Sequence, residues 1–108
     1  MRGGERPGPI ALIQVVLGGT GCPARFRVVE LVRRDSVAVT EQFGTCNEAP
    51  SAVWFDRAGA LWMRFDPYAP HFIRADPEYR DPPPTTWVYR TGGRLREVKS
   101  ADAAGAAR

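Results

Sequence analysis

Two alternating runs separated by two residues constrain the fold of this chain more than any other feature. The runs "RFRVVELVR" (25–33) and "SVAVTEQF" (36–43) alternate apolar with polar residues and are rich in β-branched side chains, which is typical of β-strands. Only Arg34 and Asp35 separate them, so we expect a tight antiparallel hairpin. A register in which paired residue numbers add to 69 gives one mostly apolar face: Phe26, Val28, Glu30 and Val32 opposite Phe43, Glu41, Val39 and Val37.

Glu30 and Glu41 interrupt that apolar face. Either the strands leave the core at these positions, or a β-bulge shifts the register there.

The two cysteines lie almost symmetrically about the same turn. Cys22, in "GTGCPARF", and Cys46, in "FGTC", have numbers that add to 68, within one of the hairpin register. The hairpin would carry both to its open end, which predicts a disulfide closing a loop of about 25 residues, worth about 3 kcal/mol. The alternative is two unrelated buried thiols, the usual state of cysteine in the cytosol. A disulfide implies an oxidising compartment.

Two further hairpins are expected. "AVWFDRAGALWMRFD" (52–66) turns at Asp-Arg-Ala-Gly, where Gly59 is free to adopt a positive φ, and "TTWVYRTGGRLREV" (85–98) turns at Thr-Gly-Gly. The piece "FDRAGALW" resembles the Asp-x-x-Gly-x-x-Trp turns of β-propeller blades, but it occurs once and therefore predicts a hairpin turn only.

With the apolar run 10–17 as a first strand, the chain has about seven strands, and no stretch in the body of the chain has a helical period; the alanine-rich tail could be frayed or form a short helix. We predict an all-β fold, a small antiparallel meander forming a barrel or a two-layer sandwich, with a long Pro-rich loop. Residues 10–98 form a single β-domain, 1–9 a flexible N-terminus and 99–108 a C-terminal tail. No segment approaches the roughly 18 to 20 apolar residues of a membrane span.

The Pro-rich loop is the segment "PYAPHFIRADPEYRDPPP" (67–84), which holds six prolines. Loops beyond about 12 to 15 residues are often functional in small domains. Two interpretations are open. Its aromatic residues could cap one end of the sheet, or the loop could bind a partner by presenting five residues: Tyr68, His71, Phe72, Arg74 and Tyr79.

Catalytic chemistry is sparse. His71 is the one histidine, and Asp66 or Asp76 could support it as a general base, but no nucleophile motif accompanies it. One histidine and two separated cysteines match no metal-ligand spacing. The "GGTG" of 18–21 is followed by Pro23 and a strand, whereas a phosphate-binding loop requires a following helix. We therefore expect no catalytic residue, metal or cofactor.

The charge pattern is ambiguous. The net charge is +3, and fourteen of the fifteen basic residues are arginine, but they are spread along the chain among twelve acidic residues. Nucleic acid is therefore not the expected partner.

Three segments, "LGGTGCPARF", "FGTC" and "WVYRTGGRLRE", resemble a group of small exported bacterial β-rich proteins of unknown function. In that group a GGxxCPA segment and an FGxC segment flank a strand pair behind a signal peptide. The resemblance covers residues 15–65 and 85–97, and it implies a disulfide and export but no activity. This sequence departs from the pattern in the segment after Asp66 and in having no leader, which would then lie outside this chain.

These observations favour a non-enzymatic, periplasmic or secreted β-domain that binds a protein or cell-envelope partner, as an inhibitor or immunity protein does. The alternative is a cytoplasmic, Arg-rich module that binds nucleic acid or a protein complex through exposed aromatics such as Trp54, Trp62 or Trp87.

Overall fold

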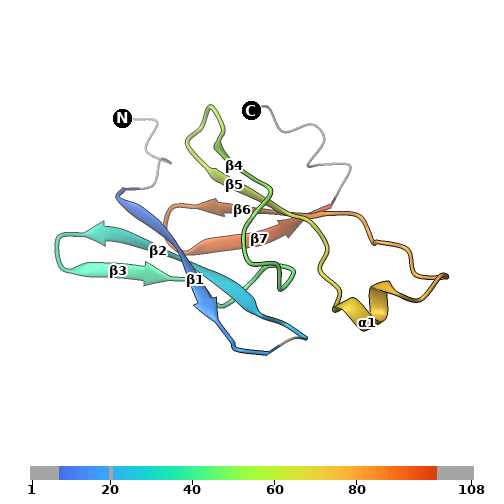
Figure 1. The fold of residues 1–108 in the computed structure, drawn as a ribbon. Helices are drawn as coiled ribbons and strands as arrows, with labels where there is room; N and C mark the ends of the chain where they lie inside the picture. The colour runs from blue at the N-terminus through green and yellow to red at the C-terminus, as the bar shows by residue number, and fades with distance from the viewer. Residues whose placement is uncertain (1–7, 20, 100–108) are drawn as a thin grey trace.

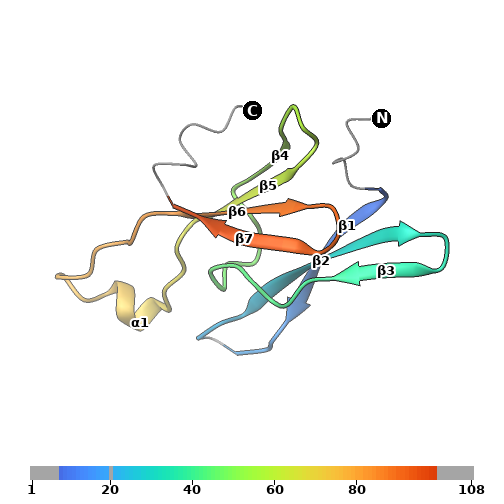
Figure 2. The same ribbon diagram turned by 180° about the vertical axis from the view of Figure 1, so that it is seen from behind.

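Seven antiparallel strands form two sheets in the computed structural model, which describes residues 8–19 and 21–99 (Figures 1 and 2). A three-stranded sheet has the order β1-β2-β3, with strands Ile10–Val16, Ala24–Arg33 and Ser36–Val39. A four-stranded sheet has the order β4-β5-β6-β7, with strands Ala52–Phe55, Leu61–Phe65, Thr85–Arg90 and Arg94–Val98. One short helix, α1 (His71–Arg74), lies between β5 and β6. The predicted all-β meander is confirmed, and its two sheets are arranged as in a sandwich.

The main hydrophobic core lies between the two sheets. Its buried residues come from β2, the loop after β3, β5 and β6: Phe26, Val28, Phe43, Leu61, Met63, Phe65 and Tyr89. The Phe65 ring lies 5.2 Å from the ring of Phe26 and 5.8 Å from that of Phe43. Full burial of one such side chain contributes about 1.5 to 3 kcal/mol, so these contacts are the main force that joins the sheets.

A second apolar cluster lies on the opposite face of the four-stranded sheet. It contains Ala60, Trp62, Val88 and Val98, with Trp54 packed against it. The β4–β5 turn fixes this cluster, because the Asp56 carboxylate accepts hydrogen bonds from the Ala60 amide at 2.9 Å and from Trp62 Nε1 at 2.8 Å. Gly59 adopts the expected positive φ of 90°. The Asp-x-x-Gly-x-x-Trp pattern thus forms a hairpin turn and also orients an indole ring.

The register of the first hairpin differs from the predicted one. Val29 pairs with Val39 and Leu31 with Val37, so the paired numbers add to 68 there, and a bulge between Leu31 and Arg33 restores 69 at the turn. Because side chains alternate across a strand, this one-residue shift turns Val37 and Val39 to the outer face, where they are 59% and 52% exposed. Their predicted core position was wrong.

Near the open end of the hairpin the numbers of paired residues again add to 69, because Phe26 bridges to Phe43 there. The change occurs at buried Thr40, whose Oγ1 accepts a hydrogen bond from the Val28 amide at 2.9 Å in place of a backbone carbonyl. Phe43 therefore reaches the core as predicted, whereas Glu41 is exposed.

The predicted disulfide joins Cys22 and Cys46 at this open end, with their Cα atoms 4.7 Å apart. Gly44, at φ 114°, makes the preceding turn, and a Cβ there would lie 3.6 Å from the rings of Phe26 and Phe65. The hairpin and its crosslink therefore continue directly from the core.

At the edges of the described chain, Gly8 donates a hydrogen bond to the Glu30 carboxylate and Pro9 accepts one from the Leu31 amide, so both contact β2. The rest of the predicted N-terminus, and the predicted tail beyond Lys99, lie outside the described residues.

None of the described residues forms a helix long and apolar enough to cross a membrane.

Glu30 is the most buried charged residue of the described chain, with 1% of its surface exposed. One carboxylate oxygen accepts hydrogen bonds from the Tyr89 hydroxyl and the Gly92 amide, and the other accepts from the Thr91 hydroxyl and the Gly8 amide. The carboxylate therefore joins the N-terminal edge of the three-stranded sheet to the β6–β7 turn of the other sheet. Neither sequence interpretation of Glu30 described this role.

We expect the protein to lose stability in acid as Glu30 becomes protonated. Burial acts to raise the pKa of Glu30, but its four hydrogen bonds outweigh burial and hold the pKa below the ordinary value of 4.5. Because the folded pKa is the lower one, this stabilisation is present above about pH 4.5 and is lost as the pH falls through the folded pKa. Urea unfolding midpoints measured between about pH 7 and pH 3 should fall steeply below about pH 4.5 and fall less in Glu30→Gln. An equal decline in both proteins would contradict this assignment.

Candidate functional site

The Pro-rich loop between β5 and β6 is the segment that projects furthest from the sheets (Figures 1 and 2). It contains α1, which begins after Pro70. The Pro70 carbonyl accepts hydrogen bonds from the amides of Ile73 and Arg74, and the Asp76 carbonyl accepts one from the Tyr79 amide. Local bonds of this kind, with prolines that limit the unfolded ensemble, let a loop keep one shape without a core of its own.

The base of the loop is attached to the segment that carries the disulfide. The Asp66 carbonyl accepts hydrogen bonds from Thr45 Oγ1 at 2.6 Å and from Asn47 Nδ2 at 3.3 Å. Because Cys46 lies between these two residues, the crosslink and the start of the loop form one connected unit. The disulfide thus contributes to positioning the loop as well as to closing the hairpin.

The five predicted partner-binding residues divide into two groups. Tyr68 and Tyr79 are half-buried, and Tyr79 is hydrogen-bonded to the Asp81 carboxylate. Desolvation first, and then this bond and the charge of Asp81, raise the pKa of Tyr79. His71, Phe72 and Arg74 all lie exposed on α1. The structure therefore brings three of the five together on the exposed helix α1, whereas the other two are half-buried.

Phe72 is the most exposed aromatic residue among those described, at 70%, and Ile73 beside it is 41% exposed. Neither belongs to the two hydrophobic clusters. The interpretation in which the loop aromatics cap the sheet therefore does not describe these two side chains.

Beneath the loop lies a polar hollow of about 440 Å³. Its walls carry the charged residues Asp66, Arg74 and Asp81 together with prolines and Asn47. His71 is exposed outside this lining and forms no side-chain hydrogen bond or ion pair with the part of the chain that the structure describes. Within that part, no group of three or more His, Cys, Asp or Glu side chains is placed to hold a metal ion.

Sequence reasoning did not single out three arginines that the fold gathers on the four-stranded sheet: Arg90, Arg94 and Arg96. The signal was present in "YRTGGRLR", because a hairpin centred on Thr-Gly-Gly places alternate residues of its two strands on the same face.

No protein-family model, curated protein or solved structure matches the chain. The resemblance to small exported bacterial proteins therefore stays a prediction. Two of its structural implications, a strand pair and a disulfide between Cys22 and Cys46, are present in the fold.

Proposed function

We propose that this protein is a non-enzymatic, exported β-domain that binds a protein partner through helix α1 of its Pro-rich loop. The observation that carries the proposal is the exposure of Phe72 and Ile73 on a helix held by local hydrogen bonds. An aromatic anchor on a pre-organised loop gains affinity because little conformational entropy is lost on binding. His71 and Arg74 provide polar contacts at the rim.

The disulfide supports the export part of the proposal, because such bonds form and persist in oxidising compartments such as the periplasm and are rare in the cytosol. A partner in or near the cell envelope fits that location, and a groove-bearing protein fits an aromatic side chain flanked by aliphatic and basic neighbours. The function we infer is that of an inhibitor or immunity protein, whose loop enters a groove of its target.

A Phe72→Ala variant should bind the partner at least about tenfold more weakly, because hot-spot aromatics contribute about 1.4 kcal/mol or more. Its free energy of unfolding should stay within about 0.5 kcal/mol of that of the wild type, since the Phe72 ring belongs to neither hydrophobic cluster. Binding is measured with immobilised protein and a periplasmic extract, the retained protein being identified by mass spectrometry and then titrated in pure form.

Phe55→Ala is the matched control, because Phe55 is also an exposed phenylalanine, 53% exposed on strand β4. It should leave partner affinity unchanged. Equal affinity of Phe72→Ala and the wild type would overturn the proposal, and a large loss of stability in Phe72→Ala would instead support the capping interpretation.

A further inference from the structure

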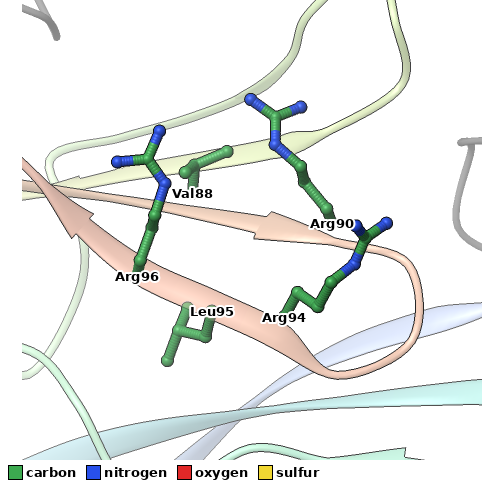
Figure 3. A pocket seen from close by; sticks show the side chains of 5 residues that line it. All are labelled: Val88, Arg90, Arg94, Leu95 and Arg96. Atoms are coloured by element: carbon green, nitrogen blue, oxygen red, sulfur yellow. The ribbon is translucent and has the colours of Figure 1, made fainter.

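Three of the four edge strands in the two sheets carry protection against pairing with another chain. An edge strand presents unpaired backbone groups, and proteins usually keep it short or add charged side chains or a bulge. β3 and β4 have four residues each, and the pairing of β3 also contains the bulge between Leu31 and Arg33. β7 carries Arg94, Arg96 and Glu97, and Figure 3 shows its two arginine side chains extending from one face of the strand.

The fourth edge strand, β1, has none of these protections. It is the longest of the four, with seven residues (IALIQVV), and it contains no charged residue, proline or glycine. It pairs with β2 without a register shift, from Ile10 opposite Glu30 to Val16 opposite Ala24. Among the described strands it pairs with β2 alone. A long, regular and uncharged edge of this kind is suited to pairing with a further strand.

The hydrogen bonds to β2 show which backbone groups of β1 face away from the sheet. The Pro9 carbonyl accepts from the Leu31 amide, and the Leu17 amide donates to the Pro23 carbonyl. Because alternate residues of an antiparallel pair exchange hydrogen bonds, the odd-numbered residues of β1 direct their backbone groups toward β2. The amides and carbonyls of the even-numbered residues in Ile10–Val16 therefore face outward. In the part of the chain that the structure describes, these groups have no hydrogen-bond partner.

The outward backbone groups of β1 are complementary to themselves. Ile13 is the middle residue of the strand, and a second copy aligned antiparallel about it places Leu12 opposite Gln14 and Ile10 opposite Val16. All four of these flanking residues are even-numbered, so each pair can exchange two hydrogen bonds. This alignment uses the whole length of the strand, which gives about eight backbone hydrogen bonds.

The side chains of the same alignment are complementary as well. Ile13 is 43% exposed on the outer face of the sheet and lies opposite its own copy. This central pair is a non-hydrogen-bonded one, in which opposite side chains approach each other most closely. Ala11 lies opposite Val15, so the outer-face contact of the two strands is apolar throughout.

We propose that β1 pairs with β1 of a second copy of this chain and forms a two-fold symmetric dimer. A two-fold contact requires a surface that matches itself, which β1 does. The pairing joins the two three-stranded sheets into one continuous sheet that ends in the protected strand β3 on both sides, so association stops at two copies. A single strand pair is a small interface, and we expect a dissociation constant of about 10 μM.

Sedimentation equilibrium of the purified protein tests the dimer, and the wild type should change from monomer to dimer between about 1 μM and about 300 μM. Gln14→Pro should weaken association at least about tenfold, because it removes an outward amide and leaves the hydrogen bonds to β2 in place. Gln14→Ala is the matched control. It removes the same exposed side chain, with its bond to the Glu48 carbonyl, but keeps the amide, and should associate within about twofold of the wild type.

A second set of variants tests the centre of the pairing and does not depend on proline. Ile13→Lys should weaken association because it places like charges directly opposite each other in the dimer. An equimolar mixture of Ile13→Lys and Ile13→Glu should associate at least about threefold more tightly than either variant alone, since the central charges are then opposite. Val39→Lys is the control: Val39 is also exposed on the outer face, but on β3, and its substitution should leave association unchanged. Urea unfolding shows that each variant is folded.

The dimer and the binding proposed for α1 fail separately, because Phe72→Ala should dimerise as the wild type does. A wild type that stays monomeric up to about 1 mM would overturn the dimer. If its partner affinity then falls in Gln14→Pro, β1 binds another protein instead. Equal association of Gln14→Pro and Gln14→Ala would also overturn the dimer, as would equal weakening by Val39→Lys and Ile13→Lys, which would place the contact on the face of the sheet and not at its edge.

Discussion

A Glu30→Ala variant is expected to unfold with a free energy about 4 kcal/mol smaller than that of the wild type. The substitution removes the acceptor of four hydrogen bonds, from the hydroxyls of Tyr89 and Thr91 and the amides of Gly92 and Gly8. Of these donors the Tyr89 hydroxyl belongs to a buried residue, and such a donor left without a partner costs about 1 to 3 kcal/mol, whereas the exposed Gly8 and Gly92 amides can bind water instead. Breaking a buried charged pair typically costs about 3 to 5 kcal/mol in total. For a domain whose whole stability is of the order of 5 to 15 kcal/mol, this loss is large.

Glu30→Gln separates hydrogen bonding from cavity formation, because it preserves the shape of the side chain. Each carboxylate oxygen faces one backbone amide, from Gly92 or Gly8, and an amide donor cannot become an acceptor. The new NH₂ group must therefore face an N–H, and we expect a loss of about 2 kcal/mol. Urea unfolding followed by tryptophan fluorescence gives both values.

Glu41→Gln is the matched control, since Glu41 is the other acidic residue of the predicted apolar face and lies exposed. It should change the free energy of unfolding by less than about 0.5 kcal/mol. In addition, Tyr89→Phe and Glu30→Gln should be non-additive, because they remove partners of the same bond. Wild-type stability in Glu30→Gln would show that the carboxylate does not join the two sheets.

The role of Glu30 also shows where sequence reasoning ended. A glutamate in an apolar stripe appears as a defect of the strand, because its partners Tyr89 and Thr91 are 59 and 61 residues away in the chain. Tyr89 reports the same contact, since burial and then its bond to Glu30 raise the pKa of its hydroxyl from 10.0 to about 12. Contacts at such separations depend on how two sheets pack, which local periodicity does not contain.

Local features were predicted better because they depend on neighbouring residues. The strands follow from alternation, and the turns follow from Gly59 and from Gly92 and Gly93, all of which adopt positive φ. The bulge between Leu31 and Arg33 was harder, because a two-residue turn is compatible with more than one register and a shift of one residue exchanges the faces. The outward positions of Val37 and Val39 are the consequence.

For the candidate sites, too, the local features could be predicted from the sequence, whereas the features that depend on tertiary packing could not. The Pro-rich loop was found because proline and aromatic residues alternate in sequence, but whether Phe72 packs or projects depends on where the loop lies relative to the core. The arginine cluster was missed because fourteen arginines spread along the chain appear as background, and three of them meet only after the β6–β7 hairpin forms.

The double variant Cys22→Ala, Cys46→Ala is expected to be about 3.5 kcal/mol less stable than the oxidised wild type. The bridge joins residues 24 apart, and closing a loop of about 25 residues lowers the entropy of the unfolded chain by that amount at room temperature. The folded state should change little, because both cysteines lie beyond the Phe26–Phe43 bridge, where the pairing of β2 with the segment after β3 ends. Urea unfolding of the oxidised protein, the reduced protein and the variant measures the effect.

The reduced wild type is the internal control for this variant, because it lacks the crosslink but keeps both sulfur atoms. Reduced wild type and double variant should unfold at similar urea concentrations, well below the oxidised protein. Two free thiols per chain in denatured, unreduced protein purified from its native compartment would contradict the crosslink, and with it the support for export. A crosslink that is present but leaves the stability unchanged would instead show that the unfolded chain already holds these segments together, since the loop-closure effect acts through the unfolded state.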